Sequence, residues 1–221
     1  VLNRAGGMRF SAGMAFPLDL ELDAAGAHRG AWLGSVQVLD YGDTSAEYST
    51  LRRGCGVLDA GFRGAFRLTG EDRVSFLQGM VSNDVKRLAD GEGVYATMLT
   101  VQGRVVTDLR IYRLAEALWL DVPALRLTTA RETLGKYIVA DDVEIEDLED
   151  VPLLALEGPA AAAVCQAALG IDLSTLRPLN HVPFELEGSV GRLVAVSHGG
   201  EVGALCFASR PLGPSLWRRL L

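Results

Sequence analysis

Cysteine is scarce in this sequence, and its spacing excludes two kinds of structural support. The 221 residues include three cysteines, Cys55, Cys165 and Cys206, with no CxxC pair and no Cys/His pattern of zinc ligands. Such an odd and scattered set predicts neither a disulfide framework nor a structural zinc site, and we expect no metal centre. Isolated thiols fit a reducing compartment, so the expected location is the cytoplasm.

Long hydrophobic runs are also missing. No stretch approaches the run of about 20 apolar residues that a membrane-spanning helix needs. Near the start of the sequence, Asp19, Glu21 and Asp23 lie where a signal peptide would need its apolar segment. We therefore expect no membrane partner and no secretion.

Positive charge is in deficit. Lys plus Arg number 21 against 28 for Asp plus Glu, which gives a net charge of −7. A broad phosphate-neutralising surface is not expected, so nucleic acid is excluded as a default partner, although a local basic pocket is compatible with this balance. The 49% hydrophobic content without runs of like charge predicts a compact globular protein.

The order of the expected elements predicts two similar α+β units in tandem. A strand (36–42) and a helix (44–54) come first, and the pattern then becomes strand, helix, three strands, helix and strand, at 65–70, 71–81, 93–100, 104–112, 117–122, 125–138 and 142–148. A second series follows, with a strand, a helix, three strands and a terminal helix, at 151–158, 159–170, 183–188, 192–197, 203–209 and 215–221. Hairpins rather than helical crossovers join most strands, which predicts antiparallel sheets. No phosphate-loop motif interrupts either series.

Three parts of the chain are expected. Residues 1–35 form an N-terminal extension without sustained periodicity. Residues 36–60 combine with 149–221 into one α+β unit, and residues 61–148 form the second unit. Trp119 and Trp217 are expected to anchor the cores of the two units.

A hairpin in the second unit collects polar side chains on one face. A two-residue turn at Gln102-Gly103 would pair Val101 with Arg104, and on that register Thr97 faces Asp108 while Tyr95 faces Arg110. The opposite face carries the expected core residues Ala96, Met98, Val105, Leu109 and Ile111, with Thr107 as the polar member of the second strand. The pattern predicts either a binding site on the polar face or ordinary solvated charges on the outside of a sheet.

Other polar residues favour structural roles. Asn83 and Asp84 follow a helix and are typical of a loop that ends it. The three histidines, His28, His181 and His198, have no Cys or acidic partner in ligand spacing. Cys55, between two glycines, is interpreted as a packing thiol because no base lies near it in the sequence.

The segment FLQGMVSNDVKRLADGEGVYATMLTVQGRVVTDLRIYRL resembles the folate-binding region of the aminomethyltransferase (glycine cleavage T-protein) family and its YgfZ-type relatives. The resemblance covers roughly residues 46–221 and includes LRRGCGVLDAGFRGAFRLTGEDRVSFLQ and LLALEGPAAAAV. It implies two tandem ferredoxin-like units around a central pocket for tetrahydrofolate. The family's C-terminal barrel, and the K-G-C-Y-x-G-Q-E signature of YgfZ-type members, are absent from this sequence.

The resemblance also implies roles for site residues. Tyr95 matches the tyrosine that lines the folate pocket, and Asp108 matches the second aspartate of the family's G-G-I-I-D-D-L segment, where a carboxylate could orient the pterin, stabilise a cationic intermediate or take a proton. Thr97 and Arg110, on the same face, complete the expected folate-binding set, with Asp108 as the catalytic residue and Arg110 steering the ligand's carboxylates.

Departures from the family pattern keep several functions open. Thr107 replaces the first aspartate of the pair, Val122 stands in place of an asparagine, and SHGGEVGALCF (197–207) replaces the R-T-G-Y-T-G-E segment, where Glu201 is either a substitute carboxylate or an exposed turn residue. The preferred expectation is a folate-binding protein in iron–sulfur cluster assembly or repair, with iron–sulfur proteins as partners, or in one-carbon metabolism. The alternatives are an interaction module that has lost folate binding and a true aminomethyltransferase.

Overall fold

The computed structural model describes residues 17–32, 35–148 and 150–221. Its α-helices are α1 (Pro17–Ala24), α2 (Thr44–Arg53), α3 (Arg73–Gln78), α4 (Leu127–Gly135), α5 (Ala161–Leu169) and α6 (Gly213–Leu220). Its strands are β1 (His28–Trp32), β2 (Ser35–Asp40), β3 (Gly56–Asp59), β4 (Arg63–Thr69), β5 (Gly93–Leu99), β6 (Val105–Arg113), β7 (Leu118–Pro123), β8 (Glu144–Asp147), β9 (Asp150–Glu157), β10 (His181–Leu186), β11 (Ser189–Ala195) and β12 (Gly203–Ser209). None of the described helices is long and apolar enough to cross a membrane.

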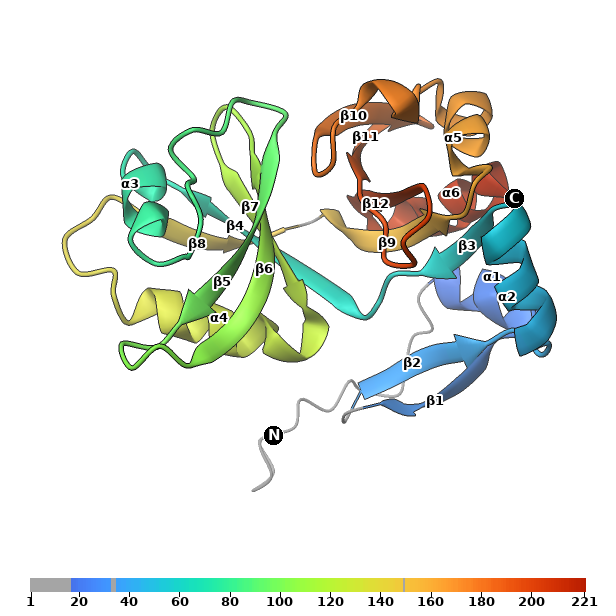
Figure 1. Ribbon diagram of the computed structural model, residues 1–221, viewed down its shortest axis with the longest axis horizontal. Helices are drawn as coiled ribbons and strands as arrows, with labels where there is room; N and C mark the ends of the chain where they lie inside the picture. Colours follow the sequence, from blue (N-terminus) through green and yellow to red (C-terminus); the bar gives the residue numbers. More distant parts are fainter. Residues whose placement is uncertain (1–16, 33–34, 149) are drawn as a thin grey trace.

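The strands form two five-stranded sheets and a separate two-stranded ribbon. One sheet, called the β4–β8 sheet below, has the order β5-β6-β7-β4-β8. The other, called the β9–β12 sheet, has the order β10-β11-β12-β9-β3 and so also contains β3. The ribbon is the pair of β1 and β2. The strand pairs are antiparallel throughout these sheets. Figure 1 shows the β4–β8 sheet with α3 and α4 on one side of the molecule and the β9–β12 sheet with α5 and α6 on the other. The α+β class with antiparallel sheets predicted from the sequence is therefore confirmed.

The segment expected as an N-terminal extension holds regular structure where it is described. Residues 17–32 contain α1 and β1, whereas residues 1–16 lie outside the described part of the chain. Leu18 and Leu22 of α1 are buried in the same core cluster as Leu216 and Trp217 of α6. The missing periodicity reflects the length of α1, since a helix of eight residues has only two turns in which to repeat an apolar position.

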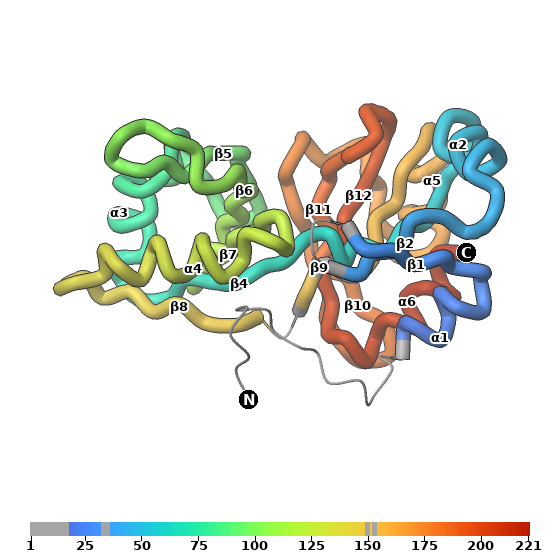
Figure 2. Tube along the Cα trace, turned by 90° about the horizontal axis from the view of Figure 1, so that it is seen from below, coloured from blue at the N-terminus to red at the C-terminus, as the bar shows by residue number. Residues whose placement is uncertain are grey.

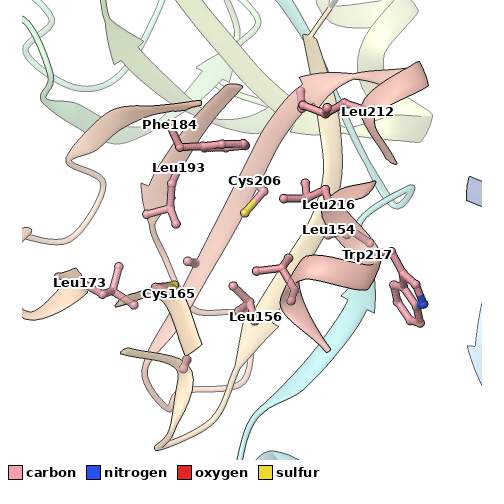
Figure 3. Packing of buried hydrophobic residues seen from close by; sticks show 14 of the residues in the cluster. Leu154, Leu156, Cys165, Leu173, Phe184, Leu193, Cys206, Leu212, Leu216 and Trp217 are labelled. Atoms are coloured by element: carbon pink, nitrogen blue, oxygen red, sulfur yellow. The ribbon is translucent and has the colours of Figure 1, made fainter. Parts of the chain in front are cut away.

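Each large sheet is covered on one face by helices. In the β4–β8 sheet, Phe66, Met98 and Leu120 pack with Leu77 of α3 and Leu134 of α4. In the β9–β12 sheet, alternate residues of the strands pack against α5 and α6, as Figure 3 shows for Leu154, Leu156, Leu193 and Cys206. The alternation of buried and exposed positions on the strands directs one apolar face of each sheet toward its helices.

The cysteines contribute to packing rather than to chemistry. Cys165 of α5 and Cys206 of β12 are fully buried in the core drawn in Figure 3, and the half-buried Cys55 packs against the same cluster. Burial raises the pKa of the Cys165 thiol to about 12 and raises the pKa of Cys55 and Cys206 as well. A raised pKa disfavours the thiolate that nucleophilic chemistry needs.

The helix-free faces of the two sheets pack against each other. Nine buried residues fill the centre of this seam: Ala60, Ala65, Tyr112, Ala117, Trp119, Ala155, Val194, Leu205 and Phe207. Trp119 belongs to this seam, with its ring centroid 5.7 Å from that of Phe207, so the expectation that it anchors the core of a single unit was wrong. Trp217 lies in the helix-covered core of the β9–β12 sheet, as expected. Figure 2 shows β4 running from the β4–β8 sheet toward the other half of the molecule.

Candidate functional site

Strands β5 and β6 bring the four predicted site residues onto one face. Tyr95 is opposite Arg110 and Thr97 is opposite Asp108, which is the predicted register. Ala96, Met98, Leu109 and Ile111 alternate with them and are buried against the helices. The polar side chains therefore lie on the helix-free face, toward the hairpin end of the two strands.

The turn that sets this register differs from the prediction. The backbone N–H of Thr100 donates to the carbonyl of Arg104 at 2.8 Å, and the N–H of Gly103 donates to the carbonyl of Thr100 at 2.8 Å. The loop therefore has three residues, 101–103, and Val101 does not pair with Arg104 as the two-residue turn required. Gly103 occupies the left-handed region with φ of 79°, as the third residue of such a loop commonly does.

A β-bulge compensates for the longer loop. Leu99 pairs with Val105 and Met98 pairs with Thr107, so Val106 is left without a partner. Without this extra residue in β6, the three-residue loop would place Asp108 opposite Ala96 and turn its side chain toward the core. The bulge also explains why Val105 is 66% exposed, although it was predicted to face the core.

The Ser82-Asn83 segment supports β5 from its open edge. The Oγ of Ser82 accepts a hydrogen bond from the backbone N–H of Thr97 and lies 2.9 Å from the Thr97 Oγ1. The Nδ2 of Asn83 donates to the carbonyl of Tyr95 at 2.9 Å. These bonds fix the strand that carries the two β5 site residues, and they already use the hydroxyl of Thr97.

Tyr95 and Asp108 offer free groups on this face. Tyr95 is 51% exposed, and Asp108 is half-buried. Among the described residues, no side chain or backbone N–H forms a hydrogen bond or ion pair with the Asp108 carboxylate. A half-buried carboxylate without internal donors is available to accept hydrogen bonds from a ligand.

Arg110 is held by a buried carboxylate. Its Nη1 lies 3.2 Å from the Oδ2 of Asp121, a β7 residue with no exposed surface. Asp121 also accepts hydrogen bonds from the Nε of Arg63 at 2.7 Å and from the hydroxyl of Tyr112 at 3.0 Å. Burial raises the pKa of Tyr112 well above its usual value, and the nearby charge of Asp121 adds to the effect. Two arginines therefore share one carboxylate within the seam.

His198 joins this cluster to the other sheet. Its Nε2 lies 3.1 Å from Nη1 of Arg110, and its Nδ1 lies 3.1 Å from Oε1 of Glu157 in β9. Because arginine only donates, Nε2 must accept, and the ring proton lies on Nδ1, where the carboxylate accepts it. The geometry therefore assigns the neutral Nδ1–H tautomer to His198. The ring of Phe62 packs edge-on against this imidazole, with centroids 5.2 Å apart.

Glu157 is anchored by the loop that carries His198. It accepts from the backbone N–H of His198 at 2.6 Å and from the hydroxyl of Ser197 at 2.8 Å. Burial by itself raises the pKa of Glu157, but the hydrogen bonds from His198, Ser197 and Gly199 outweigh it and hold this pKa below its usual value. The result is a continuous chain from Glu157 through His198 and Arg110 to Asp121.

Sequence reasoning missed most of this network. Asp121, Glu157 and His198 were not predicted as site residues, because Asp121 and Glu157 interrupt strands that otherwise have the composition of core. A single carboxylate within such a strand is the signal that could have found them, since a buried charge requires a partner.

The residues at which the chain departs from the family pattern form ordinary structural contacts. Glu201 forms an ion pair with Arg52 of α2, with 2.7 Å between Oε1 and Nη1. Thr107 is buried, with its hydroxyl donating to the carbonyl of Asp108, and Val122 is fully buried in the core of the β4–β8 sheet. Among the described residues, no three His, Cys, Asp or Glu side chains form a group that could hold a metal ion.

Two cavities lie outside the Asp108 face. One of about 510 Å³ is lined by β2, α2 and β3, and one of about 480 Å³ lies where β6 and β7 meet β10 and β11. Neither is lined by Tyr95, Thr97, Asp108 or Arg110. The candidate site thus lies outside both of these cavities, on the helix-free face of β5 and β6.

The family model and the curated relatives that match this chain point to the same family. The model of the GCVT N-terminal domain matches residues 20–221. The aminomethyltransferase of Anoxybacillus flavithermus is 32% identical over 208 residues, which cover 93% of this chain and 56% of the relative. The aminomethyltransferase of Thermus thermophilus is 34% identical over 180 residues, which cover 80% of this chain and 52% of the relative. The chain thus spans about half the length of these curated relatives.

Solved structures agree with this result. The glycine cleavage system aminomethyltransferase T from Bartonella henselae superposes with a TM-score of 0.84 at 26% identity, over 93% of this chain and 56% of that one. A heterotetrameric sarcosine oxidase from Corynebacterium, at 18% identity and a TM-score of 0.52, shares the fold alone. The predicted resemblance to the T-protein family is confirmed, and the chain belongs to the GCVT N-terminal domain family.

Proposed function

We propose that the chain binds tetrahydrofolate or a derivative of it on the face formed by Tyr95, Thr97, Asp108 and Arg110. The observation that carries the proposal is the free, half-buried carboxylate of Asp108 on the same face as the exposed Tyr95, in a member of the GCVT family. A carboxylate accepts two hydrogen bonds from neighbouring N–H groups, and a pterin offers such groups on its edge. A tyrosine ring supplies a flat surface for an aromatic ligand.

Each side chain has a distinct role in this proposal. Asp108 accepts from the pterin N–H groups and is the catalytic residue, since its negative charge stabilises positive charge on a nearby folate nitrogen or receives its proton. Tyr95 stacks on or hydrogen-bonds the pterin. Thr97 contributes through the lone pairs of its hydroxyl, and Arg110 attracts the ligand's carboxylates from a position partly neutralised by Asp121.

Calorimetric titration of the full-length gene product with tetrahydrofolate tests the binding step. Saturable binding with one site supports the proposal, and the Asp108→Asn variant should bind more weakly while keeping its thermal unfolding midpoint. A folded protein that releases no heat with tetrahydrofolate, and that copurifies with no folate, would reject it.

For the metabolic role, we propose one-carbon transfer of the aminomethyltransferase type. The names of the matched relatives support this role. The departures from the family pattern at Thr107, Val122 and 197–207 favour a competing role, the maintenance of iron–sulfur proteins that is associated with YgfZ-type relatives. Two assays separate these roles. Activity in a methylene-transfer assay with a lipoylated carrier supports one-carbon transfer. Restored activity of iron–sulfur enzymes in a deletion strain supports iron–sulfur maintenance.

A noncatalytic interaction module is the second candidate function. The observation that favours it is that the Thr97 hydroxyl and the Arg110 guanidinium are already hydrogen-bonded within the chain. Under this alternative, Asp108→Ala leaves the binding of partner proteins unchanged, and tetrahydrofolate does not bind.

A further inference from the structure

Arg110 uses only part of its guanidinium group in the network at the seam. Its side chain is 13% exposed, and Nη1 makes both of its contacts, with Oδ2 of Asp121 at 3.2 Å and with Nε2 of His198 at 3.1 Å. A guanidinium has five N–H donors, and two of them belong to Nη1. The three donors on Nε and Nη2 are therefore not used by these contacts.

The Nε and Nη2 atoms form an open edge of Arg110. Within the described part of the chain, no acceptor is hydrogen-bonded to either atom, and neither atom is a buried polar atom without a partner. Both atoms therefore keep exposed surface. Arg110 lies on the same helix-free face of β6 as Asp108, and no ion pair joins these two described residues.

Two other arginines show what this edge of a guanidinium binds. The Nε and Nη2 of Arg67 donate to Oε2 of Glu146, at 3.0 and 2.6 Å. The same two atoms of Arg63 donate to Oδ1 and to the backbone carbonyl of Asp121, at 2.7 and 3.0 Å. The parallel N–H groups of this edge match the two oxygens of a carboxylate. The open edge of Arg110 is thus suited to a carboxylate from outside the described chain.

His198 holds Arg110 from the Nη1 side. The Nδ1 of His198 is fixed by Glu157, whose carboxylate also accepts hydrogen bonds from the backbone N–H of His198 and the hydroxyl of Ser197. The ring of Phe62 packs edge-on against the imidazole, with centroids 5.2 Å apart. These contacts restrict rotation of the imidazole and of the Nη1 group bonded to it. A ligand that binds the open edge therefore loses less entropy in ordering Arg110.

The charges around Arg110 are balanced. Arg63 and Arg110 are cations, Asp121 and Glu157 are anions, and His198 is the neutral Nδ1–H tautomer, so these five side chains carry no net charge. Such a cluster offers one planar pair of donors without a large positive field. The shape and single charge of a carboxylate match the open edge, whereas a phosphate dianion would leave more negative charge uncompensated.

We propose that the open edge of Arg110 binds a carboxylate of the ligand in a bidentate manner, and that His198 is the positioning residue that holds this edge in place. The inference rests on the proposed function, because the ligand that carries the carboxylate is the folate bound at the Asp108 face. It adds that the glutamyl part of the ligand is recognised, and that this recognition depends on a residue of the β11–β12 loop that does not touch the ligand.

Calorimetric titration of the full-length protein with tetrahydrofolate tests the proposal. Arg110→Met should weaken binding by about tenfold to a hundredfold, through the loss of hydrogen bonds to a charged group. His198→Ala should weaken it by about threefold to tenfold, since the ligand must then order the Arg110 side chain itself. His198→Gln should restore the affinity, because its Oε1 accepts from Nη1 in place of the imidazole.

The matched controls are Arg218→Met and His28→Ala. They remove an arginine and a histidine whose side chains are largely exposed, and both variants should bind tetrahydrofolate like the unaltered protein.

A second probe separates the loss of a carboxylate contact from damage to the fold. The compound 6-methyltetrahydropterin has the pterin ring but no carboxylate, so Arg110→Met and His198→Ala should not change its binding, whereas Asp108→Asn should weaken the binding of both compounds. In the unaltered protein, the NMR resonance of the Arg110 Nε–H group should shift with tetrahydrofolate and stay fixed with 6-methyltetrahydropterin.

The possible failures are distinct. The inference is overturned if tetrahydrofolate binds equally well to folded Arg110→Met or His198→Ala, if His198→Gln binds as weakly as His198→Ala, or if the Arg110 resonance does not respond. An unaltered, folded protein that does not bind tetrahydrofolate rejects the proposed function, and this inference with it.

Discussion

The imidazole of His198 accepts a hydrogen bond from Arg110, with 3.1 Å between Nε2 and Nη1, and this contact crosses from one sheet to the other. His198 belongs to the loop between β11 and β12, and Arg110 belongs to β6. The contact therefore links the orientation of a proposed folate-site residue to the second half of the chain.

Loss of His198 should weaken the seam. We expect His198→Ala to lower the free energy of unfolding by about 1–3 kcal/mol, because Glu157 and Arg110 each lose one hydrogen bond to the imidazole at the seam. The measurement is urea denaturation. The control is His28→Ala, since His28 pairs with Asp40 at a largely exposed site and should contribute less than about 1 kcal/mol. Equal losses in the two variants would contradict the assigned network.

Asp121 should be the most sensitive carboxylate in the seam. Asp121→Ala leaves the buried guanidinium groups of Arg63 and Arg110 uncompensated, and we expect a loss of about 3–5 kcal/mol in unfolding free energy. Asp147→Ala is the matched control, because Asp147 pairs with Arg131 at the surface, where an ion pair contributes about 0–1 kcal/mol. Chemical denaturation of both variants decides the point, and a small effect at Asp121 would show that the seam admits water.

Asp108 should be important for ligand binding and unimportant for folding. Asp108→Asn should weaken tetrahydrofolate binding about tenfold to a hundredfold, the effect of about 1.5–3 kcal/mol from a hydrogen bond to a charged group. Asp141→Asn, at an exposed turn position, should change nothing. If both variants bind like the unaltered protein, the pterin does not contact Asp108.

The buried imidazole of His181 predicts acid sensitivity. Burial, together with the charge of Arg192, lowers the pKa of His181 to about 4. Between pH 6.5 and pH 4, His181 binds a proton in the unfolded chain but not in the folded chain. The contribution of the neutral His181 to the free energy of unfolding is therefore fully present above pH 6.5 and is lost as the pH falls through this window. The loss is at most about 3 kcal/mol.

Denaturation at several pH values, in a buffer free of phosphate and carboxylate, checks this dependence. His181→Gln keeps an acceptor for Arg192 and cannot titrate, so its stability should fall less steeply over the same range. An identical pH profile for both proteins would exclude His181 as the cause.

The loop of the β5–β6 hairpin depends on Gly103. Its φ of 79° is unfavourable for a residue with a side chain, while no atom lies within 4 Å of an added Cβ. Gly103→Ala should therefore destabilise the protein by about 1–2 kcal/mol through backbone conformation alone. Gly135→Ala, at the end of α4 and with an ordinary contact of 3.9 Å to Ile145, should be neutral or slightly stabilising in thermal unfolding. A neutral Gly103→Ala would mean that the loop adopts another turn.

The sequence predicted nine of the ten strands of the two large sheets and the face of Asp108, because periodicity and pairing are local properties, but it did not predict the short strand β3. The register of Tyr95 and Thr97 was predicted correctly from a wrong turn, since the bulge at Val106 offsets the third loop residue. A bulge has no sequence signature as clear as a turn, which is also why the exposure of Val105 was missed. The pairing of Arg110 with His198 joins residues 88 positions apart, and only the packing of two sheets brings them together.

The short connection between β3 and β4 has a consequence for biosynthesis. Residues 60–62 lead from a strand of one sheet directly into a strand of the other. The strands β4 to β8 are contiguous in the sequence, from residue 63 to residue 147, so their sheet can form on the nascent chain once this segment has left the ribosome. The strand β3 pairs with β9, which is synthesised later. During synthesis, the half that carries Asp108 can thus mature first, while the earlier strand β3 is left with an uncovered edge.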